Sequence, residues 1–359
     1  MATNNTMQSI KFKIQALAET VNTRATHGVL FLVLDDANVS GLYTYTKLKK
    51  VTENYESENK TIISTVFSDY GVKKVVVAAK HDADNGITGC LDGALALLNK
   101  VSFNGWLTVP QITSDTDKKK VADFIKSQRN DEDYPIKGAL YNYKSDCEGI
   151  VNFTAKDLGK TASDKYVAEV AAQLCVLGPN ESITNQTAKN VTSCDVKDDN
   201  DTCVSNGELF LFNDGTNIVF SRGVNSLTTI PSEQSESLSK IRVVEVIDMV
   251  KSDIKEILKV SYLGKLGNSY KNRKTVINNI NTYLKSLSNE GYLNNDEYST
   301  AELDAEATRE YLEKKGTETD EMTDDEVLKA KLGTYVFIKI TLKIMDCIED
   351  VVINLQYTT

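Results

Sequence analysis

Cysteine and histidine are the residues of this chain that could most readily support nucleophilic or metal chemistry. The chain of 359 residues has six cysteines and only two histidines, His27 and His81. No two cysteines form a C-x-x-C pair, and their wide spacing matches neither a zinc site nor a disulfide framework. Cys194 and Cys203 share one polar stretch and could pair outside a reducing cell, but we expect two free thiols. The sequence therefore predicts no metal ion and no cofactor.

An α/β enzyme would carry its catalytic or phosphate-binding residues in recognisable motifs. Cys90 and His81 could act as nucleophile and base, but only the residue types match that chemistry. The stretch Gly86–Gly93 lacks a phosphate-binding lysine, and neither G-x-G-x-x-G after a strand nor G-x-x-x-x-G-K-[ST] occurs. A Ser-His-Asp triad would need one of the two histidines, and neither lies in a serine-protease motif. We expect no enzymatic activity, and an α/β enzyme of unknown substrate is the alternative.

Composition and charge exclude several other classes of protein. Hydrophobic residues make up 41% of the chain and charged residues 26%, which is typical of a globular protein. The net charge of −10 argues against a general nucleic-acid binder, which needs a basic face. The N-terminal residues do not resemble a signal peptide, and no apolar run is long enough for a membrane span. We expect synthesis in a cytoplasm and no membrane insertion.

The elements that would position these residues alternate between strands and helices. Gly28–Leu34 is a continuous apolar run, which is typical of a strand buried on both faces. Further strands are predicted over 72–78, 106–109, 136–141 and 150–153, and helices over 57–70, 87–102, 114–129 and 162–177. This alternation predicts a doubly wound, largely parallel sheet. A polar surface loop over 178–206 and a hairpin turn at Asp214-Gly215 should follow.

Two amphipathic helices, over 238–258 and 270–289, begin a region with segregated charge. Residues 251–274 contain seven basic and two acidic residues, a net charge of +5, whereas residues 294–328 have a net charge of −10. Such segregation favours contact between copies of the chain, or with a partner, through complementary potentials. The alternative is that both blocks are simply solvated helix faces.

Alternating apolar residues at both termini predict strands that need a partner. Ile10, Phe12 and Ile14 alternate with polar residues near the N-terminus. Near the C-terminus the alternating residues are Val336, Ile338, Ile340, Leu342 and Ile344, followed by Val351, Ile353 and Leu355. Unpaired edge strands are templates for another chain. Either these strands pair within one molecule, or they are donated to neighbours, which would build an open helical polymer.

The chain resembles the tail sheath proteins of contractile bacteriophages, most closely the defective-prophage and R-type bacteriocin (diffocin-like) branch. The resemblance is carried by collinear segments: Ile10–Ile14, Gly28–Leu32, Ser68–Val77, Cys147–Asn152, Val224–Thr229, Val244–Asp248, Tyr262–Lys265, Asn268–Arg273, Asp304–Tyr311 and Val336–Asp350. The inserted β-sandwich domain of many longer sheaths looks absent, because Val77 is followed almost directly by the predicted helix from Gly86. The 183–206 loop has no counterpart that assigns it a role.

The resemblance implies a structural subunit of a contractile injection system. Such subunits form stacked hexameric rings around an inner tail tube, meet baseplate and terminator or collar proteins, and contract to drive the tube through a cell envelope. By resemblance, the residues at both termini form intersubunit β-arms, and a helix faces the tube, with Lys251, Lys255 and Lys259 as candidates. Assembly would take place in the bacterial host cytoplasm, followed by residence in a phage virion or bacteriocin particle. A pilus or surface-layer polymer would share strand donation, but the absence of an export signal argues against it.

The expected fold class is α/β: a doubly wound, subtilisin-like sheet domain and an α+β C-terminal domain with exchanged terminal β-arms. The expected divisions are an N-terminal β-arm (1–20), an α/β segment packing with the C-terminal domain (21–85), the α/β sheath domain (86–235), the helical part of the C-terminal domain (236–333) and a C-terminal β-arm (334–359).

Overall fold

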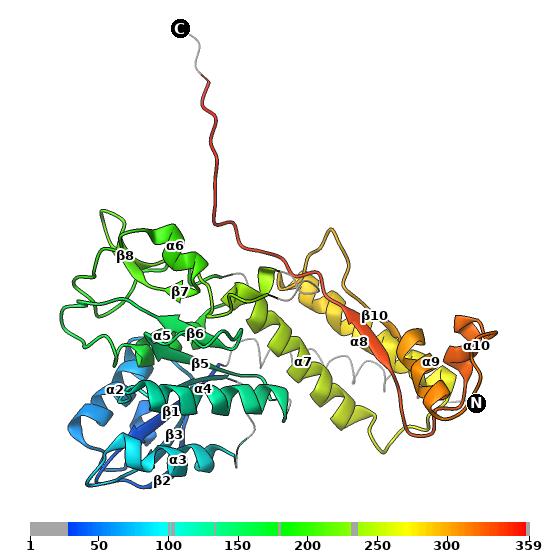
Figure 1. Ribbon diagram of the computed structural model, residues 1–359, viewed down its shortest axis with the longest axis horizontal. Coiled ribbons are helices and arrows are strands. Elements are labelled where there is room, and N and C mark those ends of the chain that lie inside the picture. Colours follow the sequence, from blue (N-terminus) through cyan, green and yellow to red (C-terminus); the bar gives the residue numbers. More distant parts are fainter. Residues whose placement is uncertain are drawn as a thin grey trace, which may run out of the picture. The chain divides into compact units, whose positions relative to one another are not determined.

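The computed structural model describes residues 28–99, 101, 105–132, 134–178, 181–230 and 236–356. Among these residues the chain divides into two units after Met249. The sheet unit contains residues 28–249 together with the returning segment from Cys347, and the helical unit contains Val250–Asp346 (Figure 1). The predicted N-terminal arm, with Ile10, Phe12 and Ile14, lies outside the described residues.

A seven-stranded sheet, in the order β2-β3-β1-β4-β5-β6-β7, forms the centre of the sheet unit. Every neighbouring pair is parallel except β2 and β3. The strands are β1 (Val29–Asp35), β2 (Gly41–Tyr45), β3 (Lys74–Lys80), β4 (Gly105–Thr108), β5 (Ile136–Tyr141), β6 (Ile150–Phe153) and β7 (Glu208–Leu209). The predicted doubly wound α/β fold is therefore confirmed.

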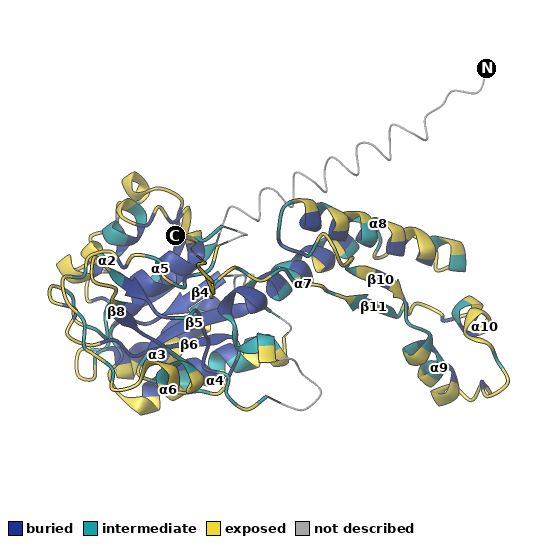
Figure 2. Ribbon diagram, turned by 90° about the horizontal axis from the view of Figure 1, so that it is seen from above, coloured by how far each residue is buried: buried dark blue, intermediate teal, exposed yellow. Residues whose placement is uncertain are grey.

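The apolar run of β1 explains why helices cover both faces of this sheet. Leu30, Leu32 and Leu34 point into one hydrophobic cluster, and Phe31 and Val33 point into the other. Because successive side chains of a strand point to opposite faces, a continuous apolar strand needs cover on both sides. Helices α2 (Ser57–Ser68) and α5 (Val167–Val176) pack in the first cluster, and α3 (Ile87–Leu98) and α4 (Asp115–Asn130) pack in the second. Figure 2 shows the buried strands between these partly exposed helices.

This sheet corrects the expected division between residues 85 and 86. Strand β1 pairs with β3 on one side and with β4 on the other, so the segment before residue 86 contributes the middle of the same sheet. Residues 28–85 therefore fold with the residues that follow them. The division misplaces the segment because helix–strand periodicity alone does not reveal which strands become neighbours.

The predicted 178–206 loop is partly integrated into the core. It contains the short helix α6 (Asn200–Ser205), while Ile183 and Ala188 are only 2% and 7% exposed. The hairpin predicted at Asp214-Gly215 is present, formed by antiparallel strands β8 (Leu211–Asn213) and β9 (Ile218–Phe220). Two 3-10 helices, η1 (Leu48–Lys50) and η2 (Glu236–Ser239), complete the described elements of this unit before α7.

A buried ionic network attaches the first turns of α7 (Ile241–Ser261) to the sheet unit. Arg129 approaches Asp248 with both terminal nitrogens, at 2.7 and 3.2 Å. Lys137 Nζ lies 3.5 Å from Asp248 and 3.2 Å from Glu245, which also accepts a 2.5 Å hydrogen bond from Trp106 Nε1. Asp248 is 1% exposed and Lys137 is 2% exposed, so each buried charge depends on its partners. Helix α7 then continues past Met249 into the helical unit.

The helical unit combines two long helices with a small antiparallel sheet. The C-terminal half of α7 and helix α8 (Tyr270–Asn289) carry the long apolar faces predicted from periodicity. Strands β10 (Thr300–Leu303) and β11 (Ile338–Thr341) pair with each other, and α9 (Ala305–Lys314) and α10 (Asp324–Lys329) lie between them in sequence. Leu312, Val327 and Leu332 form a small core for this α9–α10 region.

Candidate functional site

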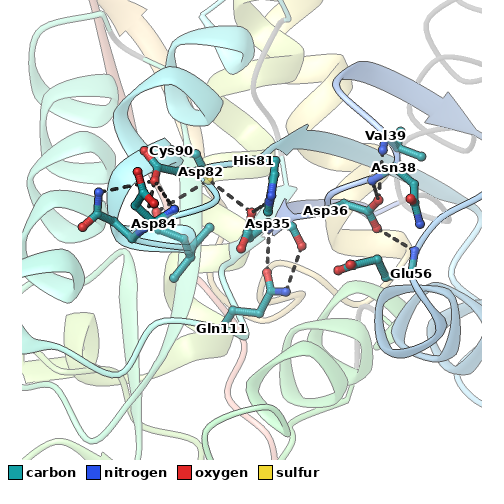
Figure 3. Close-up of polar contacts among 12 residues, drawn as sticks. Asp35, Asp36, Asn38, Val39, Glu56, His81, Asp82, Asp84, Cys90 and Gln111 are labelled. Carbon is teal, nitrogen blue, oxygen red and sulfur yellow. Dashed lines mark hydrogen bonds and ion pairs between the residues drawn. The ribbon is translucent and has the colours of Figure 1, made fainter.

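The carboxyl end of β1 is where a doubly wound sheet would bind a ligand, because the sheet is built outward from β1 in both directions, first to β2 and β3 and then to β4. Asp35 lies at this end, and its Oδ1 is 2.9 Å from His81 Nδ1, just after β3. The same oxygen is 3.8 Å from Cys90 Sγ on α3. Figure 3 shows the three side chains converging. The structure thus brings together the two residues that the sequence suggested as nucleophile and base, but through a shared carboxylate.

Polar side chains from neighbouring loops fill the space beside Asp35. Gln111 accepts a hydrogen bond from the Asp35 backbone N–H at 2.7 Å and donates to the Asp35 carbonyl at 3.0 Å (Figure 3). Asp36 accepts hydrogen bonds from the backbone N–H groups of Val39 and Glu56 at 3.0 and 2.9 Å. These bonds pair backbone N–H and C=O groups at the end of β1 and in the loops beside it, which is a structural role.

The electrostatics of Cys90 oppose a role as a nucleophile. Burial and the neighbouring Asp35 carboxylate raise the pKa of the Cys90 thiol to about 11. A reactive cysteine needs a lowered pKa, because the thiolate is the attacking species. Burial likewise raises the pKa of Cys147 to about 11. No group of three potential metal-ligating side chains occurs within the described ranges.

The first part of the predicted C-terminal arm pairs within its own chain. Residues Ile338–Thr341 form β11, with Ile338 opposite Leu303 and Thr341 opposite Thr300. An isolated bridge joins Leu293 and Ile344 farther along. The predicted alternation is present, because Ile338, Ile340, Leu342 and Ile344 are half-buried whereas Lys339, Thr341 and Lys343 are exposed. Val336 precedes the strand and is 39% exposed.

The partner strand β10 has no sufficient signal in the amino-acid sequence. Its four residues, Thr300–Leu303, alternate in burial, but they lie inside the acidic block and are too few to distinguish a strand from a loop. Asn281 of α8 fixes the strand by accepting a hydrogen bond from the Ala301 backbone N–H at 2.7 Å and donating to its carbonyl at 2.9 Å.

The second part of the predicted C-terminal arm has no strand in the described chain. Val351, Ile353 and Leu355 are 70%, 80% and 86% exposed. Residues 351–356 form neither helix nor strand and appear in Figure 1 within the red trace before the C-terminus. Residues 351–356 therefore show the alternating pattern, but no strand among the described residues pairs with them.

The three candidate lysines lie on one exposed stripe of α7. Lys251, Lys255 and Lys259 follow one another at four-residue spacing, and all three are exposed. Buried Ile254 and Ile257 occupy the opposite side of the same helix. The link that follows α7 adds exposed apolar residues, with Leu263 67% exposed. None of the helices in the described ranges is long and apolar enough to cross a membrane.

Comparisons with known proteins agree with these features. Residues 233–358 match the model of the phage tail sheath C-terminal domain. A tail sheath protein of Clostridium phage phiCD119 is 30% identical over 357 residues, which covers 97% of this chain and 98% of the relative.

Solved structures share the fold. The sheath tail protein of Listeria innocua has a TM-score of 0.68 at 14% identity, covering 92% of this chain and 99% of its own. The contracted helical sheath of the anti-feeding prophage has a TM-score of 0.64 at 15% identity, covering 93% and 94%. The near-complete match to the Clostridium phage protein shows that this chain belongs to the contractile tail sheath proteins.

Proposed function

We propose that this chain is the repeating subunit of a sheath that polymerises helically around an inner tail tube and contracts to drive that tube through a target cell envelope. The observation that carries the proposal is the 30% identity to a tail sheath protein along 97% of the chain. The chain therefore acts through assembly, and we infer no catalytic activity and no cofactor. The raised pKa of Cys90 supports this inference, since that thiol stays protonated near neutral pH.

The terminal segments are the proposed connections between subunits. Strands β10 and β11 form a two-stranded sheet, and residues 351–356 supply exposed apolar alternation that matches a strand without a partner. The proposed arms are therefore Ile10–Ile14 at the N-terminus and the segment from Val351 at the C-terminus, donated to the small sheets of neighbouring subunits. In this proposal, Val336–Ile344 forms part of the small sheet that receives a neighbour's arm, and it also takes part in the connection between subunits.

The proposed tube contact lies on the basic stripe of α7. Lys251, Lys255 and Lys259 are exposed on one helix face, where they would meet acidic groups of a tube protein. Exposed ion pairs contribute only about 0–1 kcal/mol each, so such contacts can be released one ring at a time during contraction. Stacked hexameric rings, a baseplate and a terminator or collar protein complete the proposed assembly, which forms in the host cytoplasm and remains in a virion or bacteriocin particle.

Electron microscopy of three purified chains tests the proposal. We expect hollow striated tubes from the full-length chain, and none from chains that lack residues 1–16 or residues 351–359. The second truncation removes only exposed, unpaired residues among those described, so its monomer should unfold at the same temperature as the full-length chain. Normal tubes from either truncation would contradict arm exchange. An absence of tubes from the full-length chain, both alone and with its cognate tube protein, would contradict the sheath function.

A further inference from the structure

The C-terminal segment contacts the sheet unit through Glu349 and Asp350. Arg222, two residues after β9, places Nη2 2.6 Å from both carboxylate oxygens of Asp350. Its Nε lies 3.8 Å from Glu349 Oε2. Hydrogen bonding to Asp350 raises the pKa of the Arg222 guanidinium. Two consecutive acidic residues of the segment therefore meet the same arginine.

Thr184 adds a hydrogen bond at the same point. Its Oγ1 donates to Glu349 Oε1 at 2.7 Å and accepts from the Gly223 backbone N–H at 2.9 Å. Ser182 Oγ lies 2.8 Å from the same hydroxyl. Because Gly223 is next to Arg222 in the chain, the Thr184 hydroxyl is held beside the backbone that carries the guanidinium. Thr184 belongs to the 183–206 segment, for which the sequence suggested no role.

Glu349 lies among exposed neighbours, since Ile348 before it is 88% exposed. The Glu349 side chain is 18% exposed, the Asp350 side chain is 76% exposed, and the following Val351 residue is 70% exposed. Val352, Ile353 and Leu355 are 80% exposed or more. The contact with the sheet unit therefore ends at Asp350.

We propose that Arg222 and Thr184 form an anchor that holds Glu349 and Asp350 on the sheet unit, so that the segment free to pair with a neighbouring subunit starts at Val351. The use of that segment in exchange rests on the proposed sheath function, whereas the anchor itself is a property of the single chain. The anchor separates β11 from the exchanged segment and keeps the root of that segment in one place. Because the ion pair between Arg222 and Asp350 is exposed, it is a weak contact that can open and reclose.

Limited proteolysis of the monomeric full-length chain tests the anchor. Glutamyl endopeptidase cuts after Glu349, and intact-mass spectrometry follows the loss of residues 350–359. We expect R222A to increase the rate of this cut by about two- to fivefold, the range of one exposed ion pair. D350A should increase it by a similar factor, after normalisation to the cleavage rates of matched synthetic peptides. The double variant should be no faster than either single variant, because all three lose the same contact.

Two controls keep the outcome interpretable. K329A removes the exposed ion pair between Lys329 and Asp325 in the helical unit and should leave cleavage after Glu349 unchanged. D350A changes a side chain that is 76% exposed, so it tests the anchor even if R222A fails to fold. Cleavage at the wild-type rate in D350A, or rate increases that multiply in the double variant, would overturn the proposal.

Polymerisation assays separate the anchor from the sheath function. We expect R222A to raise the concentration needed for tube formation by about two- to fivefold, because the arm root is no longer held in place. Protection of Glu349 in a chain that never forms tubes would support the anchor and contradict the sheath function. Tubes from a chain in which neither R222A nor D350A alters cleavage would support the sheath function and overturn the anchor.

Discussion

Asp35 ends the central strand β1 and interacts with His81 at 2.9 Å and with Cys90 at 3.8 Å. The three residue types suggest a catalytic arrangement, but the carboxylate lies where it disfavours the thiolate form of Cys90. The side chain of Gln111 also forms hydrogen bonds with both the backbone N–H and the backbone carbonyl of Asp35. Geometry and charge together make this a structural cluster that joins β1, α3 and the loops after β3 and β4.

The Cys90 thiol should react slowly with alkylating reagents in the folded protein. Its pKa is raised from 9.0 to about 11, so at pH 8 the thiolate fraction is about a hundredfold below that of an ordinary cysteine. The labelling rate should rise about tenfold per pH unit until the pH approaches 11. Peptide mass spectrometry after iodoacetamide treatment measures this rate, and denatured protein provides the unprotected reference. Labelling of folded Cys90 at pH 8 at the denatured rate would contradict the structural assignment.

At the scale of elements, the parts with strong periodicity could be predicted and the short ones could not. The apolar run of β1 and the helical spacing of α4 and α8 depend on many residues, so their patterns are clear. Strand β10 has four residues, and its conformation depends on pairing with β11, which comes more than thirty positions later. The alternation from Val351 to Leu355 predicted a strand, but a strand also needs a partner, and the described residues supply none. The candidate lysines came from the resemblance to tail sheath proteins, and helix periodicity places them on one face of α7. The Arg222 anchor depends on a tertiary contact without a sequence signature.

Two glycines test how tightly the central sheet is packed. A Cβ at Gly105 of β4 would overlap the carbonyl oxygen of Val29 in β1, whereas a Cβ at Gly93 of α3 would meet nothing within 4 Å. We expect G105A to lower the free energy of unfolding by about 3 kcal/mol, because strand backbone must move. G93A should raise it by about 0.5–1 kcal/mol, since alanine loses less conformational entropy in a helix. Urea unfolding of both variants measures the difference, and equal stabilities would contradict the close approach of β1 and β4.

At the scale of the whole molecule, the chain combines a firmly packed sheet unit with a helical unit and an exposed end. Helix α7 belongs to both units, and its first turns are fixed by the buried contacts of Asp248 with Arg129 and Lys137. Removing one partner of such a network costs about 3–5 kcal/mol, so this attachment should persist through assembly and contraction. The weaker contacts lie at the surface: the anchor at Arg222, and the tube contact that we propose for the basic stripe of α7. The distribution of strong and weak contacts fits a subunit that keeps its own fold while its connections to neighbours rearrange.

A chain truncated after Asp350 should inhibit polymerisation of the full-length chain. It keeps β10, β11 and the anchor and can therefore receive an arm, but it has no C-terminal arm to donate. Because head-to-tail contacts propagate only when each copy both gives and receives, each incorporated truncated copy weakens growth at its position. Mixing it with full-length chain should shorten the tubes in proportion to its mole fraction, by at least about twofold at equimolar mixing. Electron microscopy gives the length distribution, and the G93A variant mixed in the same ratios is the matched control. Tube lengths that stay constant as truncated chain is incorporated would mean that the segment after Asp350 does not connect subunits.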